Sequence, residues 1–237
     1  NSASVTVGYS DAVTGARQIR LLGLSGIYTT MLDENRPIMR GIAAPFGLSY
    51  IPGQWLESIQ IAKGPSSVIN GVEAITGQIN MEHRKPTDEK PFFLNLFLSS
   101  TLRSEMNIAS SLQLNDKWST VILAHASTDP MKHDGNGDGF RDDPTSLQFN
   151  VANRWLYYDQ SGLQVRFGVK ALYDDRTGGD MKYDKSMIDQ YGSTDIPWGT
   201  NILNKSLNGY VRVGIPLNAD NSHDIAAVAD YTYYQMD

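Results

Sequence analysis

The sequence predicts a mainly β fold in which a small mixed domain precedes a series of longer antiparallel strands. Two observations predict it. Short apolar–polar segments separated by glycine-containing turns fill residues 1–86, and alternating segments of roughly nine to eleven residues fill much of residues 87–237. The polar connector Thr87-Asp88-Glu89-Lys90 stands where the first pattern gives way to the second. We therefore expect one domain at residues 1–86 and another at residues 87–237.

Composition excludes several classes of protein. The 237 residues carry a net charge of −6 and contain no block of Lys and Arg, which argues against a nucleic-acid partner. The absence of Cys excludes a disulfide framework and Cys-ligated metals. No apolar run reaches about 18 residues, so we expect no transmembrane helix. Because neither GxSxG nor HExxH nor a Cys nucleophile occurs, we expect no enzyme activity.

The first domain is expected to consist of short strands joined by turns. The alternating segments are residues 18–23, 28–33, 37–41, 57–63 and 77–83. The last two flank a loop of small residues, and residues 63–80 together read KGPSSVINGVEAITGQIN. We expect this compact loop to bring the two flanking strands into one small sheet.

Each residue type in that loop has a physical role. Gly64-Pro65 ends a strand with a sharp turn, and Ser66-Ser67 can cap a short helical turn. Gly71 and Gly77 permit a positive φ or a close approach of two backbones. A phosphate-binding loop is not expected, because Gly71 is followed by Val72-Glu73 where such a loop needs Lys and Ser or Thr.

The second domain is expected to contain seven strands in an up-and-down arrangement. Residues 106–114, 147–157, 163–171 and 210–217 alternate between apolar and polar. Residues 92–100, 118–126 and 225–233 are also strand-like, with both faces partly apolar. About this strand length is needed to cross a bilayer at a tilt of roughly 45°. Three connections are short turns, and two others, 128–145 and 174–206, are long loops. Short turns at one end and long loops at the other are typical of outer-membrane barrels, although the connection at 103–105 is short where a long one would be expected.

The alternation alone is compatible with two environments for the apolar face. In a soluble sandwich that face packs on a second sheet, and in a membrane barrel it contacts lipid. Aromatic residues near the strand ends favour lipid, since they match the interfacial girdles of barrels. They are Trp118, Trp155, Tyr157, Tyr158, Tyr173, Tyr231, Tyr233 and Tyr234. A soluble all-β module that binds calcium or carbohydrate therefore stays open as an alternative.

The loop and its flanking strands resemble a known family signature. The matching positions are Glu57, Ile59, Ile61, Lys63, Gly64, Pro65, Ser66, Ser67, Gly71, Ala74, Ile75, Gly77, Ile79 and Asn80. In this order they resemble the plug-domain signature of TonB-dependent outer-membrane receptors. The sequence departs from the signature where Glu34 follows Asp33 in place of Gly, where Thr76 precedes Gly77, and at Asn70, where an aromatic residue is common.

The resemblance implies a plug closing a transmembrane barrel of about 22 strands. It implies import of a scarce extracellular ligand of the iron-siderophore, haem or cobalamin type across the outer membrane of a Gram-negative bacterium. TonB, with its inner-membrane energising complex and the proton-motive force, would drive this import. A SusC-like glycan importer is the alternative within the family. Seven strands cannot close so wide a barrel, so we expect a fragment with most of a plug, its N-terminal part missing, and the first barrel strands.

Two sets of residues are candidates for ligand and ion contacts. Arg36, Arg40, Phe46 and Tyr50 belong to, or precede, the segment GIAAPFGLSY, which the resemblance suggests is an apical plug loop that meets ligand. The expected polar face of the wall carries Arg154, Arg166, Lys170 and Arg212. They either line a polar interior against the plug or are ordinary wall charges, and the second explanation is preferred.

The segment HDGNGDGFRDD has the spacing of a calcium loop. Asp134, Asn136 and Asp138 stand at positions 1, 3 and 5, the Phe140 carbonyl at position 7 and Asp142 at position 9. Position 12 is Thr145 in place of the bidentate Glu, so weak binding is expected. A solvated Asp/Gly-rich loop explains the segment as well. Calcium is thus a possible ligand of an outer loop, and no other cofactor is expected.

Overall fold

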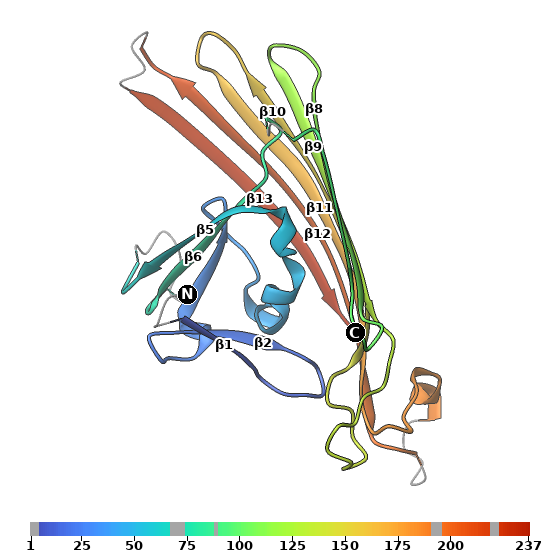
Figure 1. Cartoon of the computed structure of the whole chain (residues 1–237). Helices are drawn as coiled ribbons and strands as arrows, with labels where there is room; N and C mark the ends of the chain where they lie inside the picture. Colours follow the sequence, from blue (N-terminus) through green and yellow to red (C-terminus); the bar gives the residue numbers. More distant parts are fainter. Residues whose placement is uncertain (1–4, 67–73, 88–89, 191–195, 219–222) are drawn as a thin grey trace.

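The computed structural model describes residues 5–66, 74–87, 90–190, 196–218 and 223–237. These residues form a two-stranded, a four-stranded and a seven-stranded sheet (Figure 1). Apart from the strands they contain short 3-10 helices, and no helix in the described ranges is long and apolar enough to cross a membrane. The fold is therefore mainly β, as the alternation predicts.

The N-terminal domain contains the two smaller sheets. Strands β1 (Val5–Tyr9) and β2 (Arg17–Leu21) form a hairpin. The second sheet has the order β4-β3-β6-β5, with bounds Arg36–Pro37, Thr29–Asp33, Gly77–His83 and Leu56–Lys63. Because β3 and β6 run parallel and the other pairs antiparallel, the sheet is mixed, as expected.

Three 3-10 helices connect these strands. They are η1 (Gly26–Tyr28), η2 (Gly41–Tyr50) and η3 (Gly53–Trp55). The sequence did not predict η2, because its apolar residues have no helical period. The short helical turn expected after Ser66 lies outside the described residues, since residues 67–73 are not described.

Gly77 provides the close approach that the sequence predicts. It begins β6 with φ +140°, and a Cβ there would lie 2.1 Å from the carbonyl oxygen of Ala62 and 2.8 Å from the Leu21 side chain. Only Gly fits so near a neighbouring backbone at that φ. This contact allows β5 and β6 to pair from Lys63↔Gly77 to Ser58↔Glu82, and a register shift separates the last pair, Leu56↔His83.

The seven-stranded sheet, called the wall below, is an antiparallel meander of consecutive strands. They are β7 (Phe92–Leu98), β8 (Ser104–Gln113), β9 (Trp118–Asp129), β10 (Thr145–Tyr158), β11 (Gln164–Gly179), β12 (Gly199–Pro216) and β13 (Asp224–Met236). All seven predicted strands are confirmed. One end of the wall carries the loops 130–144 and 180–198, and the other carries the short turns 114–117 and 159–163. We call these the long-loop end and the short-turn end.

The expected loop at 174–206 is wrong in extent. Residues 174–179 and 199–206 continue β11 and β12, and they pair in register from Asp174↔Asn204 to Gly179↔Gly199. Their polar side chains resemble a loop in the sequence. In the structure Asp174 accepts from Tyr50, and Arg176 donates to the carbonyls of Thr14 and Gly15 in the N-terminal domain. On β12, Asn204 donates to Asp174. These polar contacts stabilise the extended strands.

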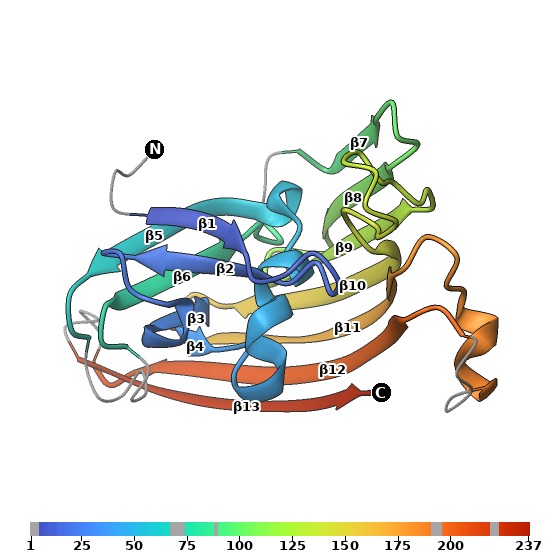
Figure 2. The ribbon, with the colours of Figure 1, turned by 90° about the horizontal axis from the view of Figure 1, so that it is seen from below.

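The two faces of the wall differ in polarity. On β10, Leu147, Phe149 and Val151 are exposed on the outer face, whereas Gln148 and Asn150 are buried on the inner face. The N-terminal domain lies on this inner, concave face (Figure 2). A soluble sandwich needs the apolar face covered, and no second layer formed by the described residues covers it. The described residues of the wall therefore form a single-layered sheet and not a two-layered sandwich.

Aromatic side chains gather at the short-turn end of the wall. The rings of Trp118 and Tyr157 lie 4.9 Å apart, and those of Trp155 and Phe167 stack at 6.1 Å. This cluster matches the expected girdle at one membrane interface.

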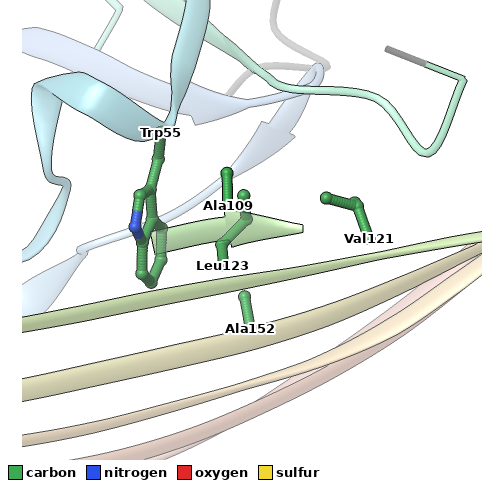
Figure 3. Packing of buried hydrophobic residues seen from close by; sticks show 5 residues of the cluster. All are labelled: Trp55, Ala109, Val121, Leu123 and Ala152. Carbon is green, nitrogen blue, oxygen red and sulfur yellow. The ribbon is translucent and has the colours of Figure 1, made fainter. Parts of the chain in front are cut away.

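Buried apolar side chains join the N-terminal domain to the wall. Trp55, at the end of η3, packs in one cluster with four wall residues, as Figure 3 shows; they are Ala109, Val121, Leu123 and Ala152. A second cluster contains Ala16, Phe46, Tyr50 and Leu172. Both clusters thus combine residues of the two domains.

Candidate functional site

Arg154 of β10 is the centre of a buried polar contact between the two domains. Its guanidinium forms an ion pair with the Glu34 carboxylate and donates to the Arg84 carbonyl over 2.6 Å and to the Tyr210 hydroxyl over 3.3 Å. Both partners of the ion pair are buried. A desolvated charge is stable only when it is paired, so this contact fixes the N-terminal domain on the wall.

Glu34 occupies the position where the family signature usually has Gly. It has φ +50° and Asn35 has φ +64°, so the β3–β4 turn places two residues in the left-handed region. That conformation costs a non-Gly residue on the order of 1 kcal/mol. The ion pair with Arg154 offsets this cost, which gives the departure from the signature a physical reason.

Arg36 makes a second contact of the same kind. Its Nη1 lies 2.5 Å from Oδ2 of Asp230 on β13, and its Nη2 lies 3.3 Å from Oδ2 of Asp33. The guanidinium also lies 3.7 Å from the ring centroid of Tyr210. Arg36 therefore bridges a carboxylate of its own domain and a carboxylate of the wall.

Asp33 and His83 lie between these two arginines. Nδ1 of His83 is 3.1 Å from Oδ1 of Asp33. Burial lowers the pKa of His83 to about 4, although Asp33 opposes this. Burial would by itself raise the pKa of Asp33, but His83 and the cations Lys170, Arg36 and Arg154 leave it below its ordinary value. Near neutral pH, His83 is neutral and Asp33 is charged.

Stability is expected to fall with acid because of His83. The His83 imidazole binds a proton near pH 6.5 in the unfolded chain and only near pH 4 in the folded protein. Its contribution to the free energy of unfolding is therefore complete above pH 6.5 and is lost as pH falls toward 4. The pKa of Asp33 is also lowered, so the stability that its charged form contributes is lost only below that pH range. His83→Asn should flatten the fall between pH 6.5 and 4, measured by denaturant unfolding in detergent. The exposed His223→Asn is the control, and equal slopes for the two variants would contradict the prediction.

Tyr50 at the end of η2 anchors that helix on the wall. Its hydroxyl donates to Oδ2 of Asp174 over 2.9 Å, and Nε of Arg176 donates to the same oxygen over 2.8 Å. Burial, together with the Asp174 charge, raises the pKa of Tyr50 far above its usual range. Gln148 and Asn150 donate to the carbonyls of Ser49 and Tyr50. Residues 41–50 therefore contact the inner face of the wall.

The four predicted ligand residues fall in different surroundings. Arg40 is exposed, and together with Tyr50 it lines a cavity of about 230 Å³ between η2 and β11–β13. Phe46 is buried, and its ring stacks on Tyr50 at 6.2 Å. Arg36 is held by the wall and does not line that cavity. The structure thus brings Arg40 and Tyr50 together, and ligand contact by any of the four stays a prediction.

A larger polar cavity, of about 300 Å³, opens toward the long-loop end. It lies between the N-terminal domain and β8–β11 and includes residues that no sequence motif contains. Its cations are Arg17, Arg103 and Arg176, and its acids are Glu105, Asp129 and Asp143. No sequence pattern predicts this group, because its members are brought together only by the docking of the two domains.

The residues of the plug-domain signature lie at the end of β5, in the turn that follows it, and in β6. Lys63 ends β5, Gly64 has φ +93°, and Pro65 and Ser66 follow. Gly71 lies outside the described residues. Asn80 is buried: its Oδ1 accepts from the Asn35 backbone over 2.8 Å, and its Nδ2 donates to Glu82 over 3.0 Å and to Gln60 over 3.2 Å. Asn80 therefore fixes the turn that carries Glu34.

The predicted calcium residues lie in the exposed loop 130–144. Asp134 accepts from the amides of Gly137, Asp138 and Gly139, and Asp142 accepts from Gly135. The side-chain oxygens therefore already bond within the loop. No group of three His, Asp or Glu side chains suited to a metal occurs in the described ranges. Calcium binding through the mixed set, which includes Asn136 and the Phe140 carbonyl, stays a prediction.

Calcium at millimolar concentration is expected to raise the melting temperature, because hard oxygen ligands at alternate positions can wrap the ion. Asp138→Ala should abolish the rise, and the exposed Asp116→Ala, in a short turn at the opposite end, should not. The measurement compares melting in calcium and in a chelator. No calcium effect on the wild-type chain would contradict the prediction.

Comparisons with known proteins agree with this architecture. Residues 1–78 match the family model of the TonB-dependent receptor plug domain, and no curated protein matches the chain. Fiu, a ferric-catecholate import receptor of E. coli K12, aligns over 98% of this chain and 35% of its own, with a TM-score of 0.68 and 14% identity. The siderophore receptor PiuA from Acinetobacter baumannii aligns over 98% of this chain and 32% of its own, with a TM-score of 0.65 and 11% identity.

A third match is the siderophore receptor PirA from Pseudomonas aeruginosa, which aligns over 100% of this chain and 42% of its own, with a TM-score of 0.61 and 14% identity. The chain thus spans between 32% and 42% of the length of these receptors. The matched proteins are transport receptors and not enzymes. Residues 1–78 therefore match the TonB-dependent receptor plug domain, and the whole chain shares the fold of the corresponding part of these siderophore receptors.

Proposed function

We propose that this chain forms the plug and adjoining barrel wall of a receptor in the outer membrane of a Gram-negative bacterium. The receptor imports a scarce extracellular ligand, with TonB and the proton-motive force supplying the energy. One observation carries the proposal: the plug lies on the polar concave face of a sheet whose opposite face is apolar and exposed. That exposed face suits lipid, and the concave face suits a water-filled path.

A ferric siderophore is the ligand class that we favour. The matched structures include a ferric-catecholate import receptor and siderophore receptors. The cavity at the long-loop end contains Arg17, which has no described carboxylate within ion-pair distance, and Arg103 and Arg176, which also pair with Glu105 and Asp174. Ferric catecholate chelates are anionic. Guanidinium groups bind such oxygen-rich anions well. An uncharged glycan would gain less from these residues.

The contacts between plug and wall also fit transport. Besides the two apolar clusters they consist of ion pairs and hydrogen bonds, such as those of Glu34, Arg36 and Tyr50. Water can replace the partners of such bonds, so each bond adds only a small net amount to the free energy that holds the plug on the wall. A plug held in this way can shift in the lumen when the path opens.

Uptake of iron by cells tests the proposal. A strain without the gene should take up less radioactive iron from a ferric catecholate chelate than its parent, and a protonophore should reduce the parent to the level of the mutant. Complementation with Arg103→Ala should restore less uptake than complementation with Lys205→Ala, whose side chain is exposed on the outer face. Uptake that is unchanged by gene deletion would overturn the siderophore assignment.

A further inference from the structure

We propose that Arg166 and Arg212 form a binding site for a water-borne oxyanion at the short-turn end of the concave face. The two residues stand directly opposite each other in the β11–β12 ladder. Directly opposite Cβ atoms lie about 5 Å apart, and two like charges at that spacing repel. The register places both residues on the face that also carries Lys170 and Tyr210, which is the plug side.

The other arginines that join plug and wall are neutralised by a carboxylate. Arg154 pairs with Glu34, Arg36 with Asp33 and Asp230, and Arg176 with Asp174.

Arg166 and Arg212 differ from these three. Among the described residues, no carboxylate lies within ion-pair distance of either side chain. An anion between the two guanidinium groups would turn their repulsion into attraction from both sides.

A cavity lies beside Arg166. It has a volume of about 180 Å³ and is lined by Arg166, Lys85, Arg154 and the polar side chains of Gln164 and Tyr210. Arg166 adds a positive charge that no described carboxylate neutralises, whereas Arg154 is engaged by Glu34 and Lys85 lies 3.5 Å from Glu57. Planar guanidinium groups bind a phosphate or carboxylate through two parallel hydrogen bonds, so this set of donors suits an oxyanion in particular.

The position in the fold indicates which oxyanions can reach the site. The outer face of the wall is the one suited to lipid, and Arg166 and Arg212 are on the other face, beside the plug. A free anion or an anionic cargo in the lumen can therefore occupy the site, whereas a headgroup of the surrounding bilayer cannot.

The cargo role rests on the proposed function. The cavity with Arg17 and Arg103 opens at the long-loop end, and Arg166 lies at the opposite end. An anionic cargo that enters at the first group would meet the second before it leaves the barrel.

Titration with inorganic phosphate tests the site. The 237-residue chain folded in detergent is expected to bind phosphate, and Arg166→Gln and Arg212→Gln should each raise the dissociation constant about tenfold. The matched control is Lys117→Gln, which removes one positive charge from an exposed turn at the same end of the wall. The proposal is overturned if the wild-type chain binds phosphate no better than the double variant, or if Lys117→Gln weakens binding as much.

Melting temperatures distinguish a ligand site from a structural role. Without phosphate, Arg166→Gln should melt at or above the wild-type temperature, because the repulsion is relieved. With phosphate, the wild-type chain should gain stability and the variant should not. A variant that melts lower than the wild-type chain by the same amount in both buffers would show a structural role and overturn the proposal.

Two further experiments are needed. One distinguishes a lipid headgroup from a water-borne anion, and the other distinguishes the oxyanion site from the proposed import function. If phosphatidylglycerol in the micelle competes with phosphate, a lipid headgroup is the occupant and the water-borne assignment is wrong. Phosphate binding that persists while cells show no gene-dependent iron uptake would remove only the cargo role. Loss of phosphate binding with normal uptake would remove only the oxyanion site.

Discussion

Trp55→Ala is expected to lower the free energy of unfolding by about 3–5 kcal/mol. The Trp55 side chain is 0% exposed and packs against wall residues, so alanine would leave a cavity between the two domains. Its Nε1 also donates to the Ala124 carbonyl over 3.4 Å, and the truncation would leave that carbonyl without this donor. Denaturant unfolding in detergent, followed by far-ultraviolet circular dichroism, measures the change.

Trp198→Ala is the matched control, since the same truncation is made where the ring is 58% exposed in the long-loop region. Its effect should stay within about 0.5 kcal/mol. If the two variants lose equal stability, the cluster around Trp55 does not hold the plug on the wall.

Glu34→Gln is expected to lower the free energy of unfolding by about 3–5 kcal/mol, since it leaves the buried Arg154 charge without its partner. The backbone at residue 34 would keep its positive φ, so the lost ion pair dominates. Chemical unfolding in detergent again gives the value.

The control makes the same change in an exposed ion pair. Glu57 lies 3.5 Å from Lys85, and both side chains are about half exposed, so Glu57→Gln should cost less than about 1 kcal/mol. In the Arg154→Gln background, Glu34→Gln should then cost much less than in the wild-type chain. An additive double variant would contradict a direct coupling between the two residues.

The sequence predicted what depends on local pattern. Period-2 alternation located the seven wall strands and the small mixed sheet, because the side chains of a strand alternate between two faces. The close approach of two backbones at Gly77 was also predicted, since only Gly fits at such a contact. The extensions of β11 and β12 were missed because polar residues such as Asp174 and Arg176 resemble a loop until their partners across the interface are known.

The pairs that fix the plug could not be predicted, because their members are far apart in the sequence. Arg36 and Asp230 are separated by 194 positions, and Glu34 and Arg154 by 120. Only the docked structure brings them together. One signal was available: Glu34 stands where the signature has Gly, and a residue that accepts a strained turn often does so for a contact made elsewhere.

The two apolar clusters, which each draw side chains from both domains, have a consequence for how the molecule unfolds. A plug released from the wall would present Trp55, Phe46 and Tyr50 to solvent, while the wall would present Leu123 and Leu172. Heating should therefore give a single calorimetric transition, with the two parts melting together as one cooperative unit.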